Sequence, residues 1–170
     1  MNSGNTKKMV TAALLAALAV IGSTFSFPVL GSKCAPVQHL VNVLCAVFLG
    51  PWWGLAAAFV SSLVRNLTGL GTPLAFPGSM CGAFLSGLLY RKFKTLPAAC
   101  IGEVAGTALL GGMLAYPVAK LIMGNAGAAL FTFVVPFLIS TAGGSIIPFV
   151  ILTTLQQTRV LGQLRQLLDS

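Results

Sequence analysis

A small group of polar and aromatic side chains has the types and spacing needed to bind an organic ligand. Gln38, His39 and Asn42 are spaced i,i+3 and i,i+4, so all three can project from one face of a helix. Lipid cannot satisfy such groups, and they should point into a helix bundle or a cavity. The alternative is that they only hydrogen-bond neighbouring helices or cap their own. The predicted binding residues are Gln38, His39, Asn42, Arg65, Asn66, Phe76, Ser79 and Tyr116.

Acidic side chains are too few for several kinds of chemistry. The sequence holds only two carboxylates, Glu103 and Asp169, whereas cation-binding lipid enzymes and proton pumps need several. The four cysteines form no C-x-x-C pair, and most lie in apolar runs where Cys behaves as a small hydrophobe. We therefore predict no metal site and no cofactor, and a pocket that suits a neutral or anionic ligand.

Glu103 is expected to lie apart from these candidates. It is about six residues into its predicted helix, roughly 9 Å of rise from the cytoplasmic end. A buried carboxylate in a membrane is a functional candidate. It can equally be a structural group that bonds Thr107 at i+4 or approaches the basic residues Arg91 and Lys92. Both interpretations remain open at this point.

Two other function classes are weaker alternatives. A membrane enzyme acting on a lipid or peptide could pair Ser79 with His39, but the sequence has no G-x-S-x-G elbow, and no acid is expected beside the histidine. A stand-alone facilitator or small channel would favour an inverted repeat, and none is detectable. Neither alternative accounts for the cluster of polar groups as well as a binding site does.

The elements that position these residues are membrane-spanning helices. Hydrophobic residues make up 56% of the 170 positions, charged residues 7%, and the mean hydropathy is +0.94. Soluble domains carry about 25% charged residues, and a membrane span needs roughly 20 apolar residues. We predict an all-α integral membrane protein with short loops, one transmembrane domain over 1–170. Its six helices would be 8–27, 37–49, 52–66, 77–90, 97–122 and 130–157, followed by an amphipathic cytoplasmic tail at 158–170.

The basic residues predict the orientation of these spans. The net charge of +8 comes from Lys and Arg scattered at segment ends, with no basic block of the kind that binds nucleic acid. With both termini in the cytoplasm, the inside positions are Lys7, Lys8, Arg91, Lys92, Lys94, Arg159 and Arg165, against Lys33, Arg65 and Lys120 outside. This excess of inside charge favours that topology. The candidate binding residues then meet in a pocket open to the outside.

Small residues line one side of the first helix. Ala12, Ala13, Ala16 and Ala17 repeat at four-residue spacing. Such a surface lets another helix approach closely, although alanine is also common in any helix.

Three segments of the sequence together resemble the ThiW family. They read PVQHLVNV, GPWWGLAAAFVSSLVRN and GTPLAFPGSMCGAFLSGLLYRK, and the resemblance covers 9–155. ThiW proteins are substrate-binding S components of energy-coupling-factor (ECF) vitamin transporters in the cell membrane. The resemblance implies a six-helix S-component bundle that binds a thiamine precursor, hydroxyethylthiazole, in an outward-facing pocket with the first loop as a lid. An S component for another small vitamin remains an alternative.

The resemblance also implies partners. S components hydrolyse no ATP themselves and work with a transmembrane T component and two ABC-type ATPases. An alanine motif on the first helix contacts the T component, which assigns that role to the alanines named above. A neutral thiazole does not require a cationic partner, so it does not explain the charge of Arg65. Arg65 would either brace carbonyls of its loop or bind a ligand that carries a phosphate or a carboxylate.

Overall fold

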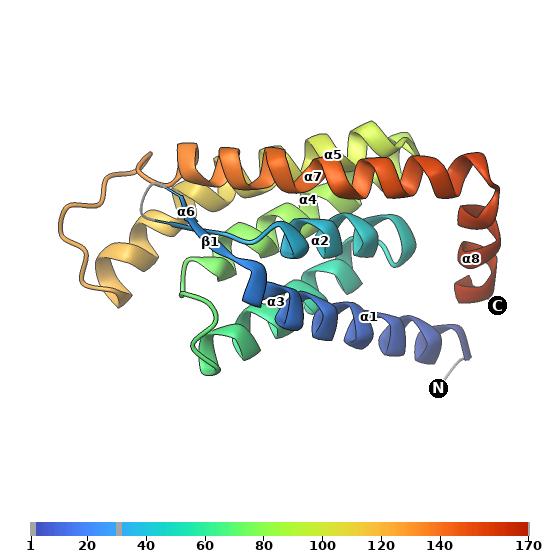
Figure 1. Cartoon of the computed structure of the whole chain (residues 1–170), viewed down its shortest axis with the longest axis horizontal. Coiled ribbons are helices and arrows are strands. Elements are labelled where there is room, and N and C mark those ends of the chain that lie inside the picture. Colours follow the sequence, from blue (N-terminus) through green and yellow to red (C-terminus); the bar gives the residue numbers. More distant parts are fainter. Residues whose placement is uncertain (1–2, 30–31, 170) are drawn as a thin grey trace.

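Long helices lying side by side make up most of the molecule (Figure 1). The computed structural model describes residues 3–29 and 32–169. In chain order the elements are α1 (Ser3–Gly22), the short 3-10 helix η1 (Ser23–Phe25), β1 (Phe27–Val29), β2 (Ser32–Cys34), α2 (Pro36–Phe48), α3 (Pro51–Leu67), α4 (Ala75–Phe93), α5 (Leu96–Ala105), η2 (Gly106–Gly111), α6 (Gly112–Pro117), η3 (Val118–Ile122), α7 (Val134–Gln157) and α8 (Val160–Asp169).

The helix starts follow from proline and glycine. Pro36 and Pro51 occupy the first turns of α2 and α3, where the missing N–H of proline costs nothing. Gly50 between these helices has φ 85°, a conformation that glycine adopts easily, so the chain reverses there within two residues. α4 begins at Ala75, earlier than the predicted 77, which places Pro77 inside the first turn.

The predicted loop at 28–36 contains a β-hairpin. Strands β1 and β2 pair antiparallel, with Phe27 opposite Cys34 and Pro28 opposite Lys33. Helical periodicity did not reveal it, because each strand has only three residues. The hairpin packs against α7 at the end of the bundle away from the two termini (Figure 1).

One predicted helix, 97–122, is continuous but not uniform. Its α-helical parts α5 and α6 alternate with two π-helical segments, η2 and η3. Single π-turns within helices are common beside functional sites. η2 packs against both α4 and α7, so its wider turn lies in the centre of the bundle. The next helix, α7, begins at Val134 and not at the predicted 130.

α2 and α4 form the centre of the bundle. α2 packs against α1, α3, α4, α5 and α7, while α4 packs against α2, α3, α5 and η2. The predicted tail is helical, and α8 lies across the end of the bundle that holds both termini (Figure 1). Arg165 on α8 donates a hydrogen bond to the hydroxyl of Tyr90 on α4 (3.1 Å).

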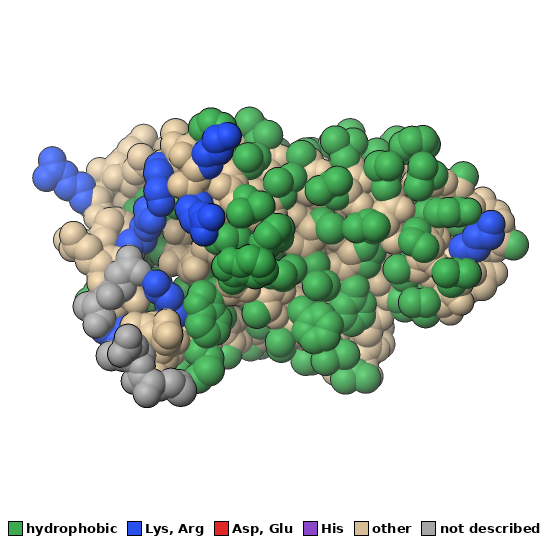
Figure 2. All heavy atoms as spheres, turned by 180° about the vertical axis from the view of Figure 1, so that it is seen from behind, with side chains coloured by type: hydrophobic (Ala, Val, Ile, Leu, Met, Phe, Trp, Pro, Cys, Tyr) green, Lys and Arg blue, Asp and Glu red, His purple; other side chains and the backbone are tan. Residues whose placement is uncertain are grey.

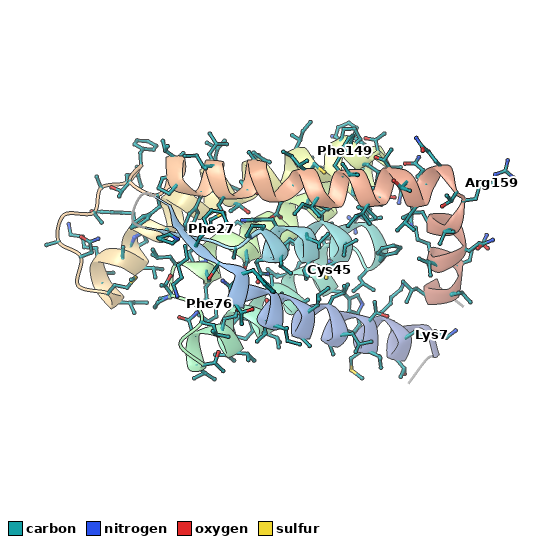
Figure 3. The ribbon with its side chains drawn as sticks, in the orientation of Figure 1. Lys7, Phe27, Cys45, Phe76, Phe149 and Arg159 are labelled. Carbon is teal, nitrogen blue, oxygen red and sulfur yellow. The ribbon has the colours of Figure 1, made fainter. Side chains whose placement is uncertain are left out.

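The surface is that of a membrane protein. Among the described residues, three helices are long and apolar enough to cross a membrane, over Gly4–Phe25, Leu96–Ile122 and Val134–Gln157, and Pro36–Phe48 is a shorter apolar helix. Figure 2 shows hydrophobic side chains around the middle, and Lys and Arg gathered mainly at one end. Lys7 and Arg159 both lie at the end with the termini (Figure 3). The all-α membrane class is thus confirmed, whereas the number of six spans and their orientation remain predictions.

The alanines of α1 divide between two faces. Ala12 and Ala16 are buried against α2 and α3, in a cluster that includes Val41, Cys45 and Ala57. Ala13 and Ala17 are exposed. Two of the four alanines predicted to contact a partner are therefore already used in packing within this chain.

Candidate functional site

A small cavity lies where the hairpin, four helices and η2 meet. Its volume is about 50 Å³. The wall is formed by Lys33, Ala35, Gln38, His39, Arg65, Thr72, Leu74, Ala75, Gly78, Ser79, Thr107, Phe137 and Ser140. These residues come from the half of the bundle that carries the hairpin and the loop between α3 and α4. Its polar side chains come from seven segments: β2, α2, α3, the α3–α4 loop, α4, η2 and α7.

The two polar stretches noted in the sequence meet at this cavity. Arg65 Nη1 on α3 donates to Gln38 Oε1 on α2 at 2.9 Å. Gln38 Nε2 in turn donates to Asn42 Oδ1 at 3.0 Å, one turn further along α2. Gln38 and Arg65 line the cavity, and Asn42 lies behind it, fully buried.

Glu103 is the acceptor at the centre of the site. It is 0% exposed, and its Oε1 is 2.8 Å from His39 Nδ1, 3.0 Å from Asn42 Nδ2 and 3.2 Å from Thr107 Oγ1. Three donors around one oxygen suit an ionised carboxylate. Since a carboxylate only accepts, His39 carries its proton on Nδ1. In the neutral imidazole with its proton on Nδ1, Nε2 is the acceptor for the hydroxyl of Ser140, 2.9 Å away.

The prediction that Glu103 lies far from the site is wrong. It placed the first turns of α2 near the outer surface. α2 has only 13 residues, however, and is preceded by the hairpin, so His39 begins deep enough to reach α5. Of the structural interpretations, the bond to Thr107 is present, and no contact with Arg91 or Lys92 is found in the described part of the chain.

Two glycines make room for this network. A methyl group at Gly82 of α4 would collide with Thr107 Oγ1 and lie 2.6 Å from Glu103 Oε2. A methyl group at Gly144 of α7 would lie 2.8 Å from His39 Cδ2 and 2.9 Å from His39 Cβ. Both distances are shorter than real Cβ contacts, so α4 and α7 can approach the site only because these positions carry no side chain.

Four of the predicted binding residues lie outside the cavity wall: Asn42, described above, and Asn66, Phe76 and Tyr116. Asn66 Nδ2 donates to the carbonyls of Ser62 and Thr72, which fixes the loop after α3. Phe76 packs on Phe59, with ring centroids 5.7 Å apart. Tyr116 is in contact with Lys120, whose Nζ donates to the tyrosine hydroxyl. Their direct contact with a ligand stays a prediction that this geometry does not favour.

The sequence analysis missed several residues of the wall. Ser79 lines the cavity as predicted, and its hydroxyl bonds that of Ser62 at 2.8 Å. The unpredicted members include Ser140, Thr107 and Phe137, the one aromatic residue in the wall. The hydroxyl residues Ser140, Thr141 and Ser145 interrupt the apolar first half of α7. That interruption was the available signal, because polar groups within spans usually face the interior.

The order Ser140–His39–Glu103 is that of a hydrolytic triad, so the expectation that no acid is beside His39 is also wrong. The serine is Ser140, not Ser79. Ser140 lies inside α7, however, and the N–H groups around it are used in the helix. Those N–H groups cannot form the oxyanion hole that acyl transfer requires. The arrangement instead fixes the tautomer and orientation of His39 at the cavity wall.

A comparison with models of known families finds a match over most of the chain. A family model described as "Thiamine-precursor transporter protein (ThiW)" matches residues 9–158. This stretch includes every residue of the cavity wall. No curated protein matches the chain.

Replacing Gly144 by Ala should destabilise the protein, whereas the same change at Gly143 should not. Both positions lie in α7, and at either position replacing Gly by Ala should stabilise the helix by about 1 kcal/mol. At Gly144 the new methyl group collides with His39, a cost of about 1–3 kcal/mol, while Gly143 has nothing within 4 Å. We expect a lower unfolding temperature for Gly144→Ala and an equal or higher one for Gly143→Ala. Equal unfolding temperatures for the two variants would contradict this packing.

Proposed function

The chain belongs to the ThiW family of thiamine-precursor transporter proteins, and we propose that it is the substrate-binding S component of an ECF-type importer in the plasma membrane. In this proposal it is a multi-pass protein with both termini in the cytoplasm. It binds hydroxyethylthiazole at the cavity near the hairpin, and partner subunits hydrolyse ATP. The family match over 9–158, together with a polar cavity inside an apolar bundle, carries the proposal.

The cavity wall matches the chemistry of a hydroxyethylthiazole. The ligand offers an apolar ring, one hydroxyl group and one weak ring-nitrogen acceptor. Phe137 supplies an aromatic face for the ring, and it is itself held by Phe133 at a centroid distance of 6.2 Å. Ser140, His39 and Gln38 supply donors and acceptors for the polar atoms. A mostly apolar bundle with a few converging polar groups is typical of small-molecule sites.

The size of the cavity implies that binding requires opening. A volume of about 50 Å³ is far below the roughly 300–1,000 Å³ of typical small-molecule pockets. The hairpin and the α3–α4 loop meet over the cavity, where Lys33 Nζ donates to the Leu70 carbonyl at 3.4 Å. This long, exposed hydrogen bond is weak. We propose that the two segments separate to admit the ligand and close over it.

The exposed alanines of α1 are the proposed contact with the T component. Ala13 and Ala17 leave a surface without large side chains, which allows a partner helix to approach closely. Ala12 and Ala16 pack within the chain and would support this surface from inside.

Replacing Phe137 by Leu should weaken hydroxyethylthiazole binding, and replacing Phe76 by Leu should not. Both changes remove one aromatic ring, but only Phe137 lies in the cavity wall. Loss of ring stacking should lower the affinity about three- to tenfold. Calorimetry on the detergent-purified protein measures this directly. A larger loss for Phe76→Leu would place the ligand ring beside Phe76 and outside this cavity.

Replacing Ala17 by Trp should abolish uptake in cells that supply the T component and ATPases, while the purified variant still binds ligand. Ala16→Trp is the matched control: Ala16 is only 4% exposed, so a tryptophan there should overpack the bundle and lower stability by at least about 1–3 kcal/mol. Full uptake by Ala17→Trp would exclude this face as the contact with the partner.

A further inference from the structure

The cavity wall carries two cationic side chains, Lys33 and Arg65, and no carboxylate. Glu103 lies behind His39 and takes no part in the wall. The region of the cavity nearest Lys33 and Arg65 is therefore positively charged.

The guanidinium of Arg65 is incompletely paired. Arg65 is 3% exposed, yet it makes one side-chain hydrogen bond, from Nη1 to Gln38 Oε1, and its buried Nε has no acceptor. A guanidinium has five N–H donors. Leaving charged donors buried without acceptors is costly, so an acceptor is expected to reach Arg65 from the cavity.

Hydrogen bonds within the described part of the protein do not account for the free N–H groups of Arg65. Carbonyls of the α3–α4 loop are held by other side chains: Thr72 O accepts from Asn66, and Leu70 O accepts from Lys33. Arg65 is also linked to Glu103 through Gln38 and Asn42, in a chain of hydrogen bonds that starts at Nη1. That chain occupies Nη1 and leaves Nε free.

We infer that this cavity binds precursors that carry an oxyanion, a phosphate monoester or a carboxylate, more tightly than the neutral alcohol. The oxyanion lies between Arg65 and Lys33, and the ring lies against Phe137. A planar guanidinium can bind two oxygens of either group with parallel hydrogen bonds. Lys33 is exposed, and its weak bond to Leu70 leaves it able to turn toward the anion. The inference rests on the proposed function, because it assigns the ligand class of the same cavity.

The test compares three ligands by calorimetry on the full-length protein: hydroxyethylthiazole, its phosphate monoester, and the analogue with acetate in place of hydroxyethyl. The last two distinguish phosphate from carboxylate. We expect at least one anionic ligand to bind about tenfold or more tightly than the alcohol, since charge-assisted hydrogen bonds are about twice as strong as neutral ones. Arg65→Gln should bring the ratio of the anion's affinity to the alcohol's affinity close to one.

Exposed lysines supply a matched control in case the buried Arg65 cannot be replaced without unfolding. Lys33→Gln should reduce the anion preference about two- to fivefold. Lys120→Gln removes the same charge from an exposed lysine that is not in the wall and should leave the preference unchanged.

The experiment distinguishes failure of this inference from failure of the proposed function. If the alcohol binds as tightly as both anions, or if Lys33→Gln and Lys120→Gln behave alike, the inference is overturned and the proposed function stands. If none of the three ligands binds, both are overturned.

Discussion

The carboxylate of Glu103 is the group on which the rest of the site depends. It is excluded from solvent, and the donors to its Oε1 come from His39 and Asn42 on α2 and from Thr107 on η2, whereas its Oε2 has no partner among the described residues. A single oxygen atom thus links α2 to the continuous helix that contains α5 and η2. Because His39 also contacts Ser140, the same network extends to α7. The position of the cavity wall follows from this arrangement.

Charge separation within the network gives the site its polarity. Hydrogen bonds run from Arg65 through Gln38 and Asn42 to Glu103, each donor pointing toward the anion. Such chains polarise one another in a low-dielectric interior. As a result, the acidic side chain of Glu103 is buried behind the cavity, and the cationic side chain of Arg65 lies in its wall. Gly82 of α4 and Gly144 of α7 are needed for the same arrangement, because only residues without a side chain let these helices pack against the network.

The sequence predicted the class of structure, and half of the predicted binding residues line the cavity. Scarce charges and long apolar segments are enough to predict membrane helices, and polar groups such as Gln38 and Arg65 stand out against that background because lipid excludes them. The level along the bundle at which side chains of different helices meet could not be predicted in the same way. The level at which Glu103 meets His39 depends on where α2 begins beneath the hairpin, which counting residues along each segment cannot give. Ser140 was missed because a hydroxyl within an apolar helix can also bond to the backbone of its own helix, so its presence alone does not indicate a site.

The most direct test of this account uses the only histidine in the chain. Nitrogen-15 NMR of histidine-labelled protein reports on His39 alone, without mutation. The account predicts the tautomer with the proton on Nδ1, held by Glu103, and a saturable shift of Nε2 when hydroxyethylthiazole or its anionic analogues are added. A proton on Nε2 would contradict the assigned network. Unchanged His39 resonances at a ligand concentration that calorimetry shows to be saturating would place the binding site elsewhere in the molecule.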